Sequence, residues 1–326
     1  MRVSVVGGGA WGTALASHCA RAGLAVRLWA REPEVAQAIN GRHENALFLP
    51  GVPLPKELVA FSRLGDALED AEAALVVVPS EFSRGIYREL RPVLPPGAVL
   101  VSATKGLEKD TLRRMSEVAA EEAPGHPCAV LSGPSFALEV ARALPTAVVA
   151  AAEDHAVAQR IQRALATRTF RVYSSEDVVG VELAGALKNV IAIAAGIVDG
   201  LGFGHNTVAA LITRGLAEIG RLAEALGGRP ETLSGLAGLG DLVLTCTGAL
   251  SRNRRVGQGL GRGLSLADAG AGLVAEGVRT TLVACDLARR EGIEMPIAAQ
   301  MKAVLYEHTS PRDALEALML RSLKRE

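Results

Sequence analysis

Short apolar runs alternate with amphipathic segments through the first half of the chain. The runs are rich in aliphatic and β-branched residues and are bounded by Gly, Pro or Ser, which is typical of buried parallel strands. The expected strands are Val3–Val6, Val26–Trp29, Ala74–Val78, Val99–Ser102, Cys128–Leu131 and Thr146–Ala150. The expected helices between them are Gly12–Ala22, Leu64–Ala71, Phe82–Leu90 and Thr111–Ala123. This alternation predicts an α/β domain with a doubly wound parallel sheet and helices on both faces.

The pattern changes after about Tyr173, where Ala, Leu and Gly dominate and helical periodicity replaces the strand-like runs. The expected helices of this part are Glu176–Asp199, Val208–Leu226, Leu233–Thr245, Leu266–Glu276, Arg279–Glu291, Pro296–Glu307 and Arg312–Leu320. We therefore expect an all-α second domain. The boundary near residue 175 gives domains of 1–175 and 176–326.

Composition narrows the classes of function. The 326 residues carry 35 Lys+Arg and 35 Asp+Glu, and this balance argues against a nucleic-acid or acidic-membrane binder. The four scattered cysteines and six histidines form no CxxC or HExxH motif, so we expect neither a disulfide framework nor a metal site. The N-terminus lacks the features of a signal peptide, and Gly, Lys or Asp interrupts the longest apolar stretches. We expect a cytoplasmic protein without a membrane segment.

The strongest motif is "VSVVGGGAWGTALA" at the start of the chain. Gly7, Gly9 and Gly12 form G-x-G-x-x-G directly after a strand and at the start of a helix. The first glycine permits a tight turn, the second lets the backbone approach a pyrophosphate, and the third lets the helix pack on the sheet. The helix N-terminus adds free N–H groups for the phosphates. A glycine turn alone could be structural, but this context favours dinucleotide binding.

The stretch "VRLWARE" bears on which dinucleotide is bound. Sites specific for NAD place Asp or Glu about 20 residues beyond the glycine turn, where the carboxylate binds the ribose 2′-hydroxyl. Here Arg31 occupies the end of the second expected strand, and Glu32 follows it. An arginine can bind a 2′-phosphate, whereas a carboxylate would repel it. We expect NADP and NAD to be used, with NADPH preferred, although Arg31 could be an ordinary surface residue.

Two further motifs follow expected strands of the sheet. Lys105 in "VLVSATKGLEKD" comes after a strand, which places it at the carboxyl edge where ligands of open α/β folds bind. A solvated surface lysine is the alternative. Gly133 and Ser135 in "LSGPSFALEV" also follow a strand, but by themselves they indicate only a turn that opens a helix.

Lys188 and Asn189 interrupt the nearly apolar helix "VELAGALKNVIAIAAGIVDG". An unpaired ammonium there would be costly, so Lys188 must reach a cleft or a carboxylate, unless its side chain extends to the surface. Asp199 lies too far along the same helix to be its partner. A lysine in a partly desolvated cleft suits general acid–base chemistry.

The segment from Gly235 to Gly257 combines a lone carboxylate with a polar cluster. Glycines lead to Asp241 in "GLAGLGDLVLTC", and Ser251, Arg252 and Asn253 follow in "SRNRRVG". Hydroxyl, guanidinium and amide groups suit a phosphate dianion. A solvated basic turn is the simpler interpretation of this cluster alone.

Together these motifs resemble the bacterial glycerol-3-phosphate dehydrogenases that use NAD or NADP. "GALKNVIAIAAG", "GxGxWGTALA", "ATKGLE", "SGPSFA", "GLGDLVLTC" and "SRNRRVG" occur in the family's order and spacing, up to about residue 310. The resemblance implies a Rossmann-like N-terminal domain and a C-terminal domain that resembles the 6-phosphogluconate dehydrogenase C-terminal fold. It also implies a homodimer. The implied reaction interconverts dihydroxyacetone phosphate and sn-glycerol 3-phosphate, which supplies phospholipid synthesis.

The resemblance also assigns roles to residues. Lys188 is the implied proton donor and acceptor, with Lys105 and Asp241 beside the reacting end. The implied substrate-binding residues are Lys105, Gly133, Ser135, Lys188, Asn189, Asp241, Ser251, Arg252 and Asn253. The implied cofactor-binding residues are Gly7, Gly9, Ala10, Trp11, Gly12, Arg31, Lys105, Ala137, Arg252 and Glu276. No metal is implied.

Two other functions fit a similar architecture. A 2-hydroxyacid or ketopantoate reductase would share the glycine turn but would not need the cluster at Ser251–Asn253. A non-catalytic NAD(P) sensor would have no reason to combine Lys188, Lys105 and Asp241. A structural protein without a nucleotide site fits least.

Overall fold

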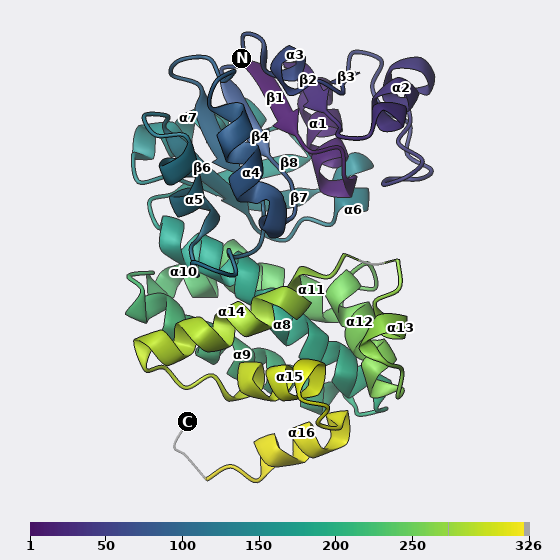
Figure 1. Ribbon diagram of the computed structural model, residues 1–326, viewed down its shortest axis with the longest axis vertical. Helices are drawn as coiled ribbons and strands as arrows, with labels where there is room; N and C mark the ends of the chain where they lie inside the picture. The colour runs from purple at the N-terminus through teal and green to yellow at the C-terminus, as the bar shows by residue number, and fades with distance from the viewer. Residues whose placement is uncertain (273, 323–326) are drawn as a thin grey trace. The chain divides into compact units, whose positions relative to one another are not determined.

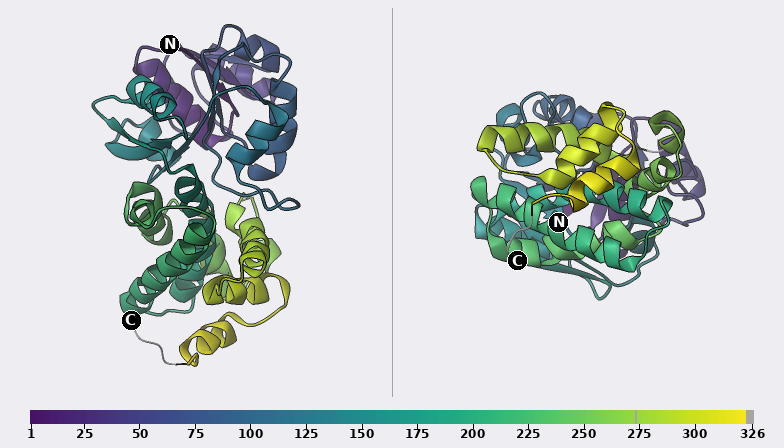
Figure 2. Two further views of the ribbon diagram at one scale, coloured as in Figure 1. Left: turned by 90° about the vertical axis from the view of Figure 1, so that its left-hand side faces the viewer. Right: turned by 90° about the horizontal axis from the view of Figure 1, so that it is seen from below.

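The computed structural model describes residues 1–272 and 274–322. The chain divides into two compact units. The first, which we call the sheet unit, consists of Met1–Glu108 and Arg113–Glu182. The second, the helical unit, consists of Lys109–Leu112 and Leu183–Glu326. Most elements of each unit are labelled in Figure 1, and Figure 2 gives two further views.

The sheet unit is built on eight strands in the order β3-β2-β1-β4-β5-β6-β7-β8. They are β1 (Arg2–Val6), β2 (Ala25–Trp29), β3 (Val59–Phe61), β4 (Ala73–Val76), β5 (Val99–Ser102), β6 (Cys128–Ser132), β7 (Thr146–Ala151) and β8 (Phe170–Ser175). Neighbouring strands are parallel, except that β7 runs antiparallel to β6. The chain order reverses at β1, which is where open α/β sheets bind their ligands.

Helices cover both faces of this sheet, as the sequence predicts. One face packs against α1 (Ala10–Arg21), α2 (Pro33–Arg42), α6 (Ala137–Ala141) and α7 (His155–Leu165). The other face packs against α3 (Leu64–Leu68), α4 (Ser80–Leu90) and α5 (Met115–Glu122). Buried aliphatic side chains of the strands alternate between the two cores, which confirms the doubly wound sheet.

Several elements of the sheet unit escaped the sequence analysis. Strand β3 has only three residues, and β8 alternates buried and exposed positions because it forms the edge of the sheet. Helices α2 and α7 are rich in polar residues on their exposed sides. The six expected strands are all present, with ends shifted by at most two residues.

The helical unit contains no strand within the described residues. Its helices are α8 (Val178–Gly200, which begins in the sheet unit), α9 (His205–Ala225), α10 (Pro230–Ser234), α11 (Asp241–Thr247), α12 (Arg252–Gly261), α13 (Leu266–Ala269), α14 (Glu276–Glu291), α15 (Pro296–Tyr306) and α16 (Pro311–Met319). A π-helical turn, η1 (Leu236–Gly240), precedes α11. The all-α second domain is confirmed.

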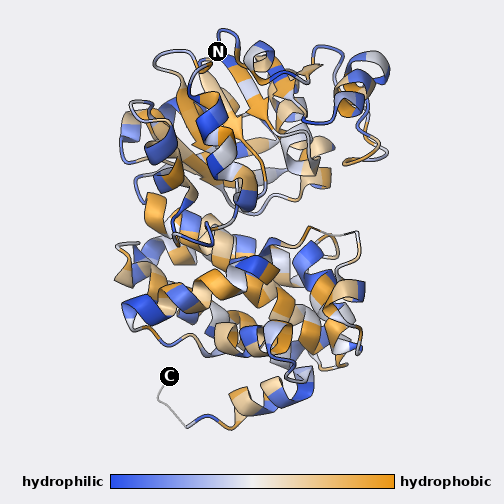
Figure 3. Cartoon of the chain, viewed as in Figure 1, coloured by the Kyte–Doolittle hydropathy of each residue, from blue (hydrophilic) through white to orange (hydrophobic). Residues whose placement is uncertain are grey.

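Helix α8 is the central apolar element, which Figure 3 shows as a largely orange ribbon. Among the described residues it alone is long and apolar enough to cross a membrane, but its apolar window is fully buried in protein. Core helices have this property, because they are apolar on all sides. Its length and composition therefore reflect burial in the unit.

Two expected helices of this unit are wrong in detail. The expected helix Leu233–Thr245 is interrupted, since α10 ends at Ser234 and the π-helical turn leads into α11. The expected helix Leu266–Glu276 is not continuous either. Helix α13 ends at Ala269 and α14 begins at Glu276, with residue 273 outside the described residues. Glycines in both segments favour turns over regular helix. The sequence analysis also missed α12, whose glycines weaken its helical pattern.

Candidate active site

The glycine turn lies between β1 and α1 at the point where the sheet order reverses. Gly7 has a φ of +132°, and a Cβ on Gly12 would lie 1.9 Å from the Gly7 carbonyl oxygen, so neither position tolerates a side chain. A Cβ on Gly9 would meet nothing within 4 Å. This open space lies at the N-terminus of α1, whose first turn has no acidic residue and no side-chain cap. The turn therefore fits the pyrophosphate of a dinucleotide.

Asn45 supports this turn from a loop after α2. Its buried amide donates to the Gly8 carbonyl oxygen (2.8 Å) and to the Thr13 hydroxyl (2.8 Å), while its oxygen accepts the Phe48 N–H (3.1 Å). Asn45 could not be predicted from the sequence, because an asparagine in a loop gives no signal of a partner more than 30 residues away. The glycine turn is thus held by a side chain as well as by its own backbone.

Arg31 lies just beyond the end of β2. A Cβ on Gly8 would lie 2.7 Å from the Ala30 Cβ, so the end of β2 runs directly beside the glycine turn. The Arg31 side chain is exposed and makes no hydrogen bond or ion pair among the described residues. Glu32 is the N-cap residue of α2. Arg31 therefore directly follows the part of the chain that lies beside the glycine turn.

Lys105, Gly133 and Ser135 come together at the carboxyl edge of the sheet. The Lys105 ammonium donates to the Gly133 carbonyl oxygen (2.7 Å) and to the Ser135 hydroxyl (3.2 Å). Gly133 has a φ of +125° and packs closely on Val148 of β7. Lys105 is therefore a half-buried, oriented cation and not a freely solvated surface lysine.

Trp11 and Ala137 lie at the starts of α1 and α6, and both are partly buried against the same core. The indole nitrogen of Trp11 is buried without a hydrogen-bond partner among the described residues. Ala10, the first residue of α1, is also partly buried. These residues line the sheet face that carries the glycine turn.

In the helical unit, Lys188 is buried and reaches a carboxylate from another helix. Its ammonium lies 2.5 Å from Asp241 Oδ1 and donates to the Thr245 hydroxyl at 2.9 Å. Lys188 and Asp241 are only 5% and 1% exposed, which is inconsistent with a lysine that extends to the surface. The Thr245 hydroxyl donates to the Asp241 carbonyl oxygen (2.6 Å). A hydrogen-bonded carboxylate compensates the burial of the lysine charge.

Thr245 is the second residue that the sequence analysis missed. It stands four residues after Asp241 on α11, so the two side chains share one face of the helix. That spacing was visible in "GLGDLVLTC", but a threonine in an apolar helix usually bonds only its own backbone. Here it also fixes the direction of Lys188.

Asn189 and Asn253 form a buried chain of amide hydrogen bonds. Asn253 donates to the Asn189 side-chain oxygen (2.9 Å) and accepts the Gly277 N–H (3.0 Å). A Cβ on Gly277 would lie 2.5 Å from the Asn189 carbonyl oxygen. The chain therefore links α8, α12 and the first turn of α14, where Glu276 is the first residue.

The cluster Ser251–Asn253 opens α12. The buried Ser251 is the N-cap residue, and its hydroxyl accepts the Arg254 N–H (3.2 Å). Arg252 is exposed, although desolvation by surrounding protein atoms lowers its pKa and the Glu276 carboxylate acts in the opposite direction. Arginine remains protonated in proteins, so Arg252 is a cation available at the helix N-terminus. This arrangement suits a phosphate group.

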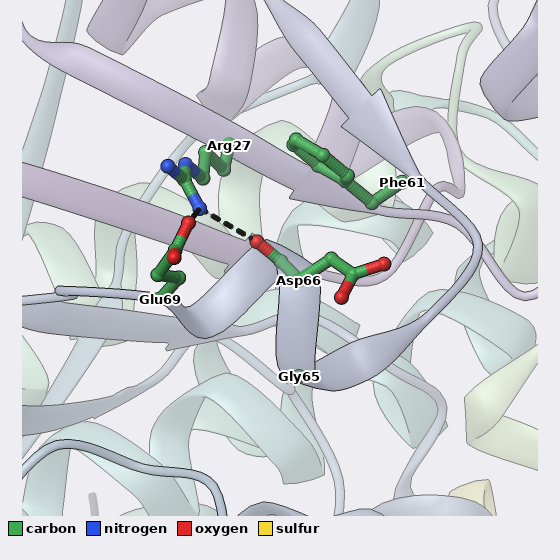
Figure 4. A pocket seen from close by; sticks show the side chains of 5 residues that line it. All are labelled: Arg27, Phe61, Gly65, Asp66 and Glu69. Atoms are coloured by element: carbon green, nitrogen blue, oxygen red, sulfur yellow. Dashed lines mark hydrogen bonds and ion pairs between the residues drawn. The ribbon is translucent and has the colours of Figure 1, made fainter.

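Two surface hollows are lined by other residues than those described above. One, of about 330 Å³, is lined by Arg27, Phe61, Gly65, Asp66 and Glu69. As Figure 4 shows, its arginine is already paired with Glu69 (2.6 Å) and with the Asp66 carbonyl oxygen (2.8 Å). The charge of this arginine is therefore already paired within the hollow. A second hollow of similar size lies beside Cys285 and Lys302.

Comparison with known proteins gives one consistent family. Residues 2–158 and 177–316 match the family models of the N-terminus and C-terminus of NAD-dependent glycerol-3-phosphate dehydrogenase. A glycerol-3-phosphate dehydrogenase (NAD(P)+) of Geobacter sulfurreducens is 53% identical, over 100% of this chain and 98% of the relative. One of Koribacter versatilis is 54% identical, over 98% of this chain and 97% of the relative.

Solved structures agree with these sequence relatives. The glycerol-3-phosphate dehydrogenase of Coxiella burnetii superposes with a TM-score of 0.94 at 43% identity, covering 98% of this chain and 99% of that one. A ketopantoate reductase of Ralstonia eutropha has a TM-score of 0.60 at 20% identity, over 97% of this chain and 100% of that one. The second likeness shows a common fold only.

Proposed function

The chain belongs to the NAD-dependent glycerol-3-phosphate dehydrogenase family, and from that premise we propose that it interconverts dihydroxyacetone phosphate and sn-glycerol 3-phosphate. The cofactors are NAD(H) and NADP(H), as in the relatives. The observation that carries this proposal is the buried Lys188, held by Asp241 and Thr245 in a family match that spans both units.

When bound, the nicotinamide of the reduced cofactor would supply a hydride to the carbonyl carbon of the substrate. The carbonyl oxygen then gains an electron pair and a proton, and the Lys188 ammonium donates that proton. In the reverse direction the neutral amine accepts it. Asp241 and Thr245 hold the lysine in one direction, which is the pre-organisation that acid–base catalysis needs.

The phosphate of the substrate is bound, in this proposal, by Ser251, Arg252 and Asn253 at the start of α12, with Asn189 beside them. Helix N–H groups, a guanidinium and an amide together favour a dianion. Lys105, Gly133 and Ser135 are the proposed substrate contacts of the sheet unit. In this assignment residues 1–175 bind the dinucleotide and 176–326 supply the remaining substrate contacts.

The glycine turn at Gly7, Gly9 and Gly12 would hold the pyrophosphate, with Ala10 and Trp11 in the same first turn of α1. The remaining proposed cofactor contacts are Arg31, Lys105, Ala137, Arg252 and Glu276. Arg31 is exposed and has no hydrogen bond or ion pair with the part of the chain that the structure describes. This supports a preference for NADPH, since a 2′-phosphate would pair with the guanidinium.

Three wider properties complete the proposal. sn-Glycerol 3-phosphate is the backbone of glycerophospholipids, so the product would supply lipid synthesis. The four cysteines are free, which fits the reducing cytoplasm. A homodimer is an expectation of the family resemblance, and light scattering coupled to size-exclusion chromatography would test it.

The reaction is tested by following the absorbance of NADPH with three additions: dihydroxyacetone phosphate, ketopantoate and buffer alone. We expect oxidation with dihydroxyacetone phosphate only. Oxidation with ketopantoate would favour the related reductases, which share this fold. Tight NADPH binding with no turnover of either compound would favour a sensor.

A further inference from the structure

Helices α8 and α12 pack together through two facing pairs of glycines. A Cβ on Gly196 would lie 2.0 Å from the Arg254 carbonyl oxygen, and one on Gly257 would lie 2.0 Å from the Ile193 carbonyl oxygen. One turn further, Cβ atoms on Gly200 and Gly261 would lie 2.5 Å from the carbonyl oxygens of Gln258 and Ile197. In each case the added methyl group would meet a backbone carbonyl oxygen, which cannot rotate away as a side chain could. We call these four glycines the glycine seam.

The seam runs in line with the polar chain described above. On α8, Asn189, Ile193, Gly196 and Gly200 follow at spacings of four, three and four residues, so they share one side of the helix. On α12, Asn253 precedes Gly257 and Gly261 by one and two turns. The hydrogen bond between Asn189 and Asn253 therefore continues the row of glycine contacts.

A second polar contact joins the same two helices. Asp199 of α8 binds Arg254 (2.9 Å) and Gln258 of α12. The two helices are thus joined by polar side chains as well as by a close approach of their backbones at the four glycines. Helices with larger residues at the contact pack at 8–10 Å, whereas glycine allows a closer approach. The register of α12 along α8 is fixed by this fit.

We propose that the glycine seam is the device that positions the phosphate-binding start of α12 relative to the helix that carries Lys188. This proposal rests on the proposed function of Ser251–Asn253. A methyl group at Gly196 or Gly257 forces the two backbones apart, and the Asn189–Asn253 hydrogen bond lies on the same line of contact. Ser251, Arg252 and Asn253 then move away from the reacting end of the substrate.

The acid–base group itself does not depend on the seam. Lys188 is held by Asp241 and Thr245, which belong to α11. A change in the seam therefore separates two parts of catalysis: the binding of the phosphate is weakened while the proton transfer group stays in place. A general loss of stability would lower both parts together.

The test compares Gly196→Ala with the wild-type enzyme on two substrates, dihydroxyacetone phosphate and dihydroxyacetone. Because displacements of about 1 Å can cost on the order of 10²-fold in rate, we expect a loss of that order in kcat/KM for the phosphorylated substrate. For dihydroxyacetone kcat/KM should be nearly unchanged. Equal losses on both substrates would overturn the proposal, since they would indicate destabilisation alone.

Two matched variants serve as controls. Gly259→Ala lies on the same helix, but the atoms nearest to its methyl group would be the Cβ and Cα of Ala269 in α13. Gly220→Ala on α9 adds a methyl group where nothing lies within 4 Å. Both should keep the wild-type ratio of kcat/KM between the two substrates. If Gly196→Ala does not fold, Gly200→Ala, which has the milder approach of 2.5 Å, replaces it.

Calorimetric titration with inorganic phosphate, without cofactor, separates this proposal from the proposed reaction. A seam variant that binds phosphate like wild type would overturn the positioning role. Absence of dihydroxyacetone phosphate reduction by the wild-type enzyme would instead overturn the reaction, and the phosphate titration would still decide the role of the seam.

Discussion

The two units build their candidate sites from different materials. In the sheet unit, backbone groups and glycines dominate: the turn at Gly7 and Gly12 excludes side chains, and Lys105 is oriented by a carbonyl oxygen and a hydroxyl. In the helical unit, charged and amide side chains from three helices meet in an apolar interior. A backbone site is local in sequence, so a motif reveals it. A side-chain site inside a helical core is assembled from distant segments, and only packing brings its members together.

The largest expected effect concerns the buried lysine. Lys188→Ala should reduce kcat by about 10²–10⁴-fold, the range for positioned acid–base groups, while leaving the dissociation constant for NADPH nearly unchanged. Steady-state kinetics and fluorescence titration of NADPH measure the two quantities. Lys188→Arg, which keeps the positive charge of the side chain, serves as the control. Turnover of the alanine variant within a few-fold of wild type would show that the helical unit does not supply the proton.

A second buried carboxylate of the helical unit, Glu218, lies at the N-terminus of α15. Burial raises the pKa of Glu218 from 4.5 to about 7. Hydrogen bonds from the backbone N–H groups of Ile297 and Ala298, and then the charges of Arg221 and Arg321, act in the opposite direction. Because the folded-state pKa is above the unfolded one, this group favours folding at low pH. That contribution is lost as the pH rises from about 4.5 through 7.

The free energy of unfolding of the wild type should therefore fall relative to that of Glu218→Gln between pH 4.5 and 8. At about 1.4 kcal/mol per pKa unit the difference amounts to at most about 3 kcal/mol. Urea unfolding of both proteins at several pH values isolates the contribution of Glu218, because the two proteins have all other titrating groups in common. Parallel pH profiles for the two proteins would contradict the raised pKa.

Arg252 tests whether the start of α12 binds the phosphate. Arg252→Ala should raise KM for dihydroxyacetone phosphate by more than tenfold, because a hydrogen bond to a charged group contributes about 1.5–3 kcal/mol. The KM for NADPH should rise much less. Arg255→Ala removes a neighbouring exposed arginine of the same helix and serves as the control. A similar loss with dihydroxyacetone, which lacks the phosphate, would contradict the assignment.

The smallest expected effect belongs to the sheet unit, where Arg31 is exposed. Arg31→Ala should weaken NADPH by about 1.5 kcal/mol, the lower end of the range for charged hydrogen bonds, because solvent screens the pair. NADH should be unaffected. The ratio of kcat/KM for the two cofactors measures this difference. An unchanged ratio would leave Arg31 as an ordinary surface residue.

The sequence by itself predicted the sheet unit well. Its strands are continuous apolar runs because parallel strands are buried on both faces, and the glycine turn is recognisable because tight turns require glycine. The antiparallel pairing of β7, the short β3 and the edge strand β8 were not predicted. The direction in which two strands pair depends on segments far apart in the chain. An edge strand such as β8 exposes alternate residues to solvent, so it lacks the continuous apolar run of a central strand.

In the helical unit the sequence determined that Lys188 needs a partner, since an isolated charge in an apolar helix is costly. Only the tertiary structure decided that the partner is Asp241, with Thr245 beside it, 53 and 57 residues further along the chain. The same holds for Asn45 behind the glycine turn and for the glycine seam between α8 and α12. Residue type and local spacing express what each position requires, but which distant group meets that requirement is set by how helices and loops pack.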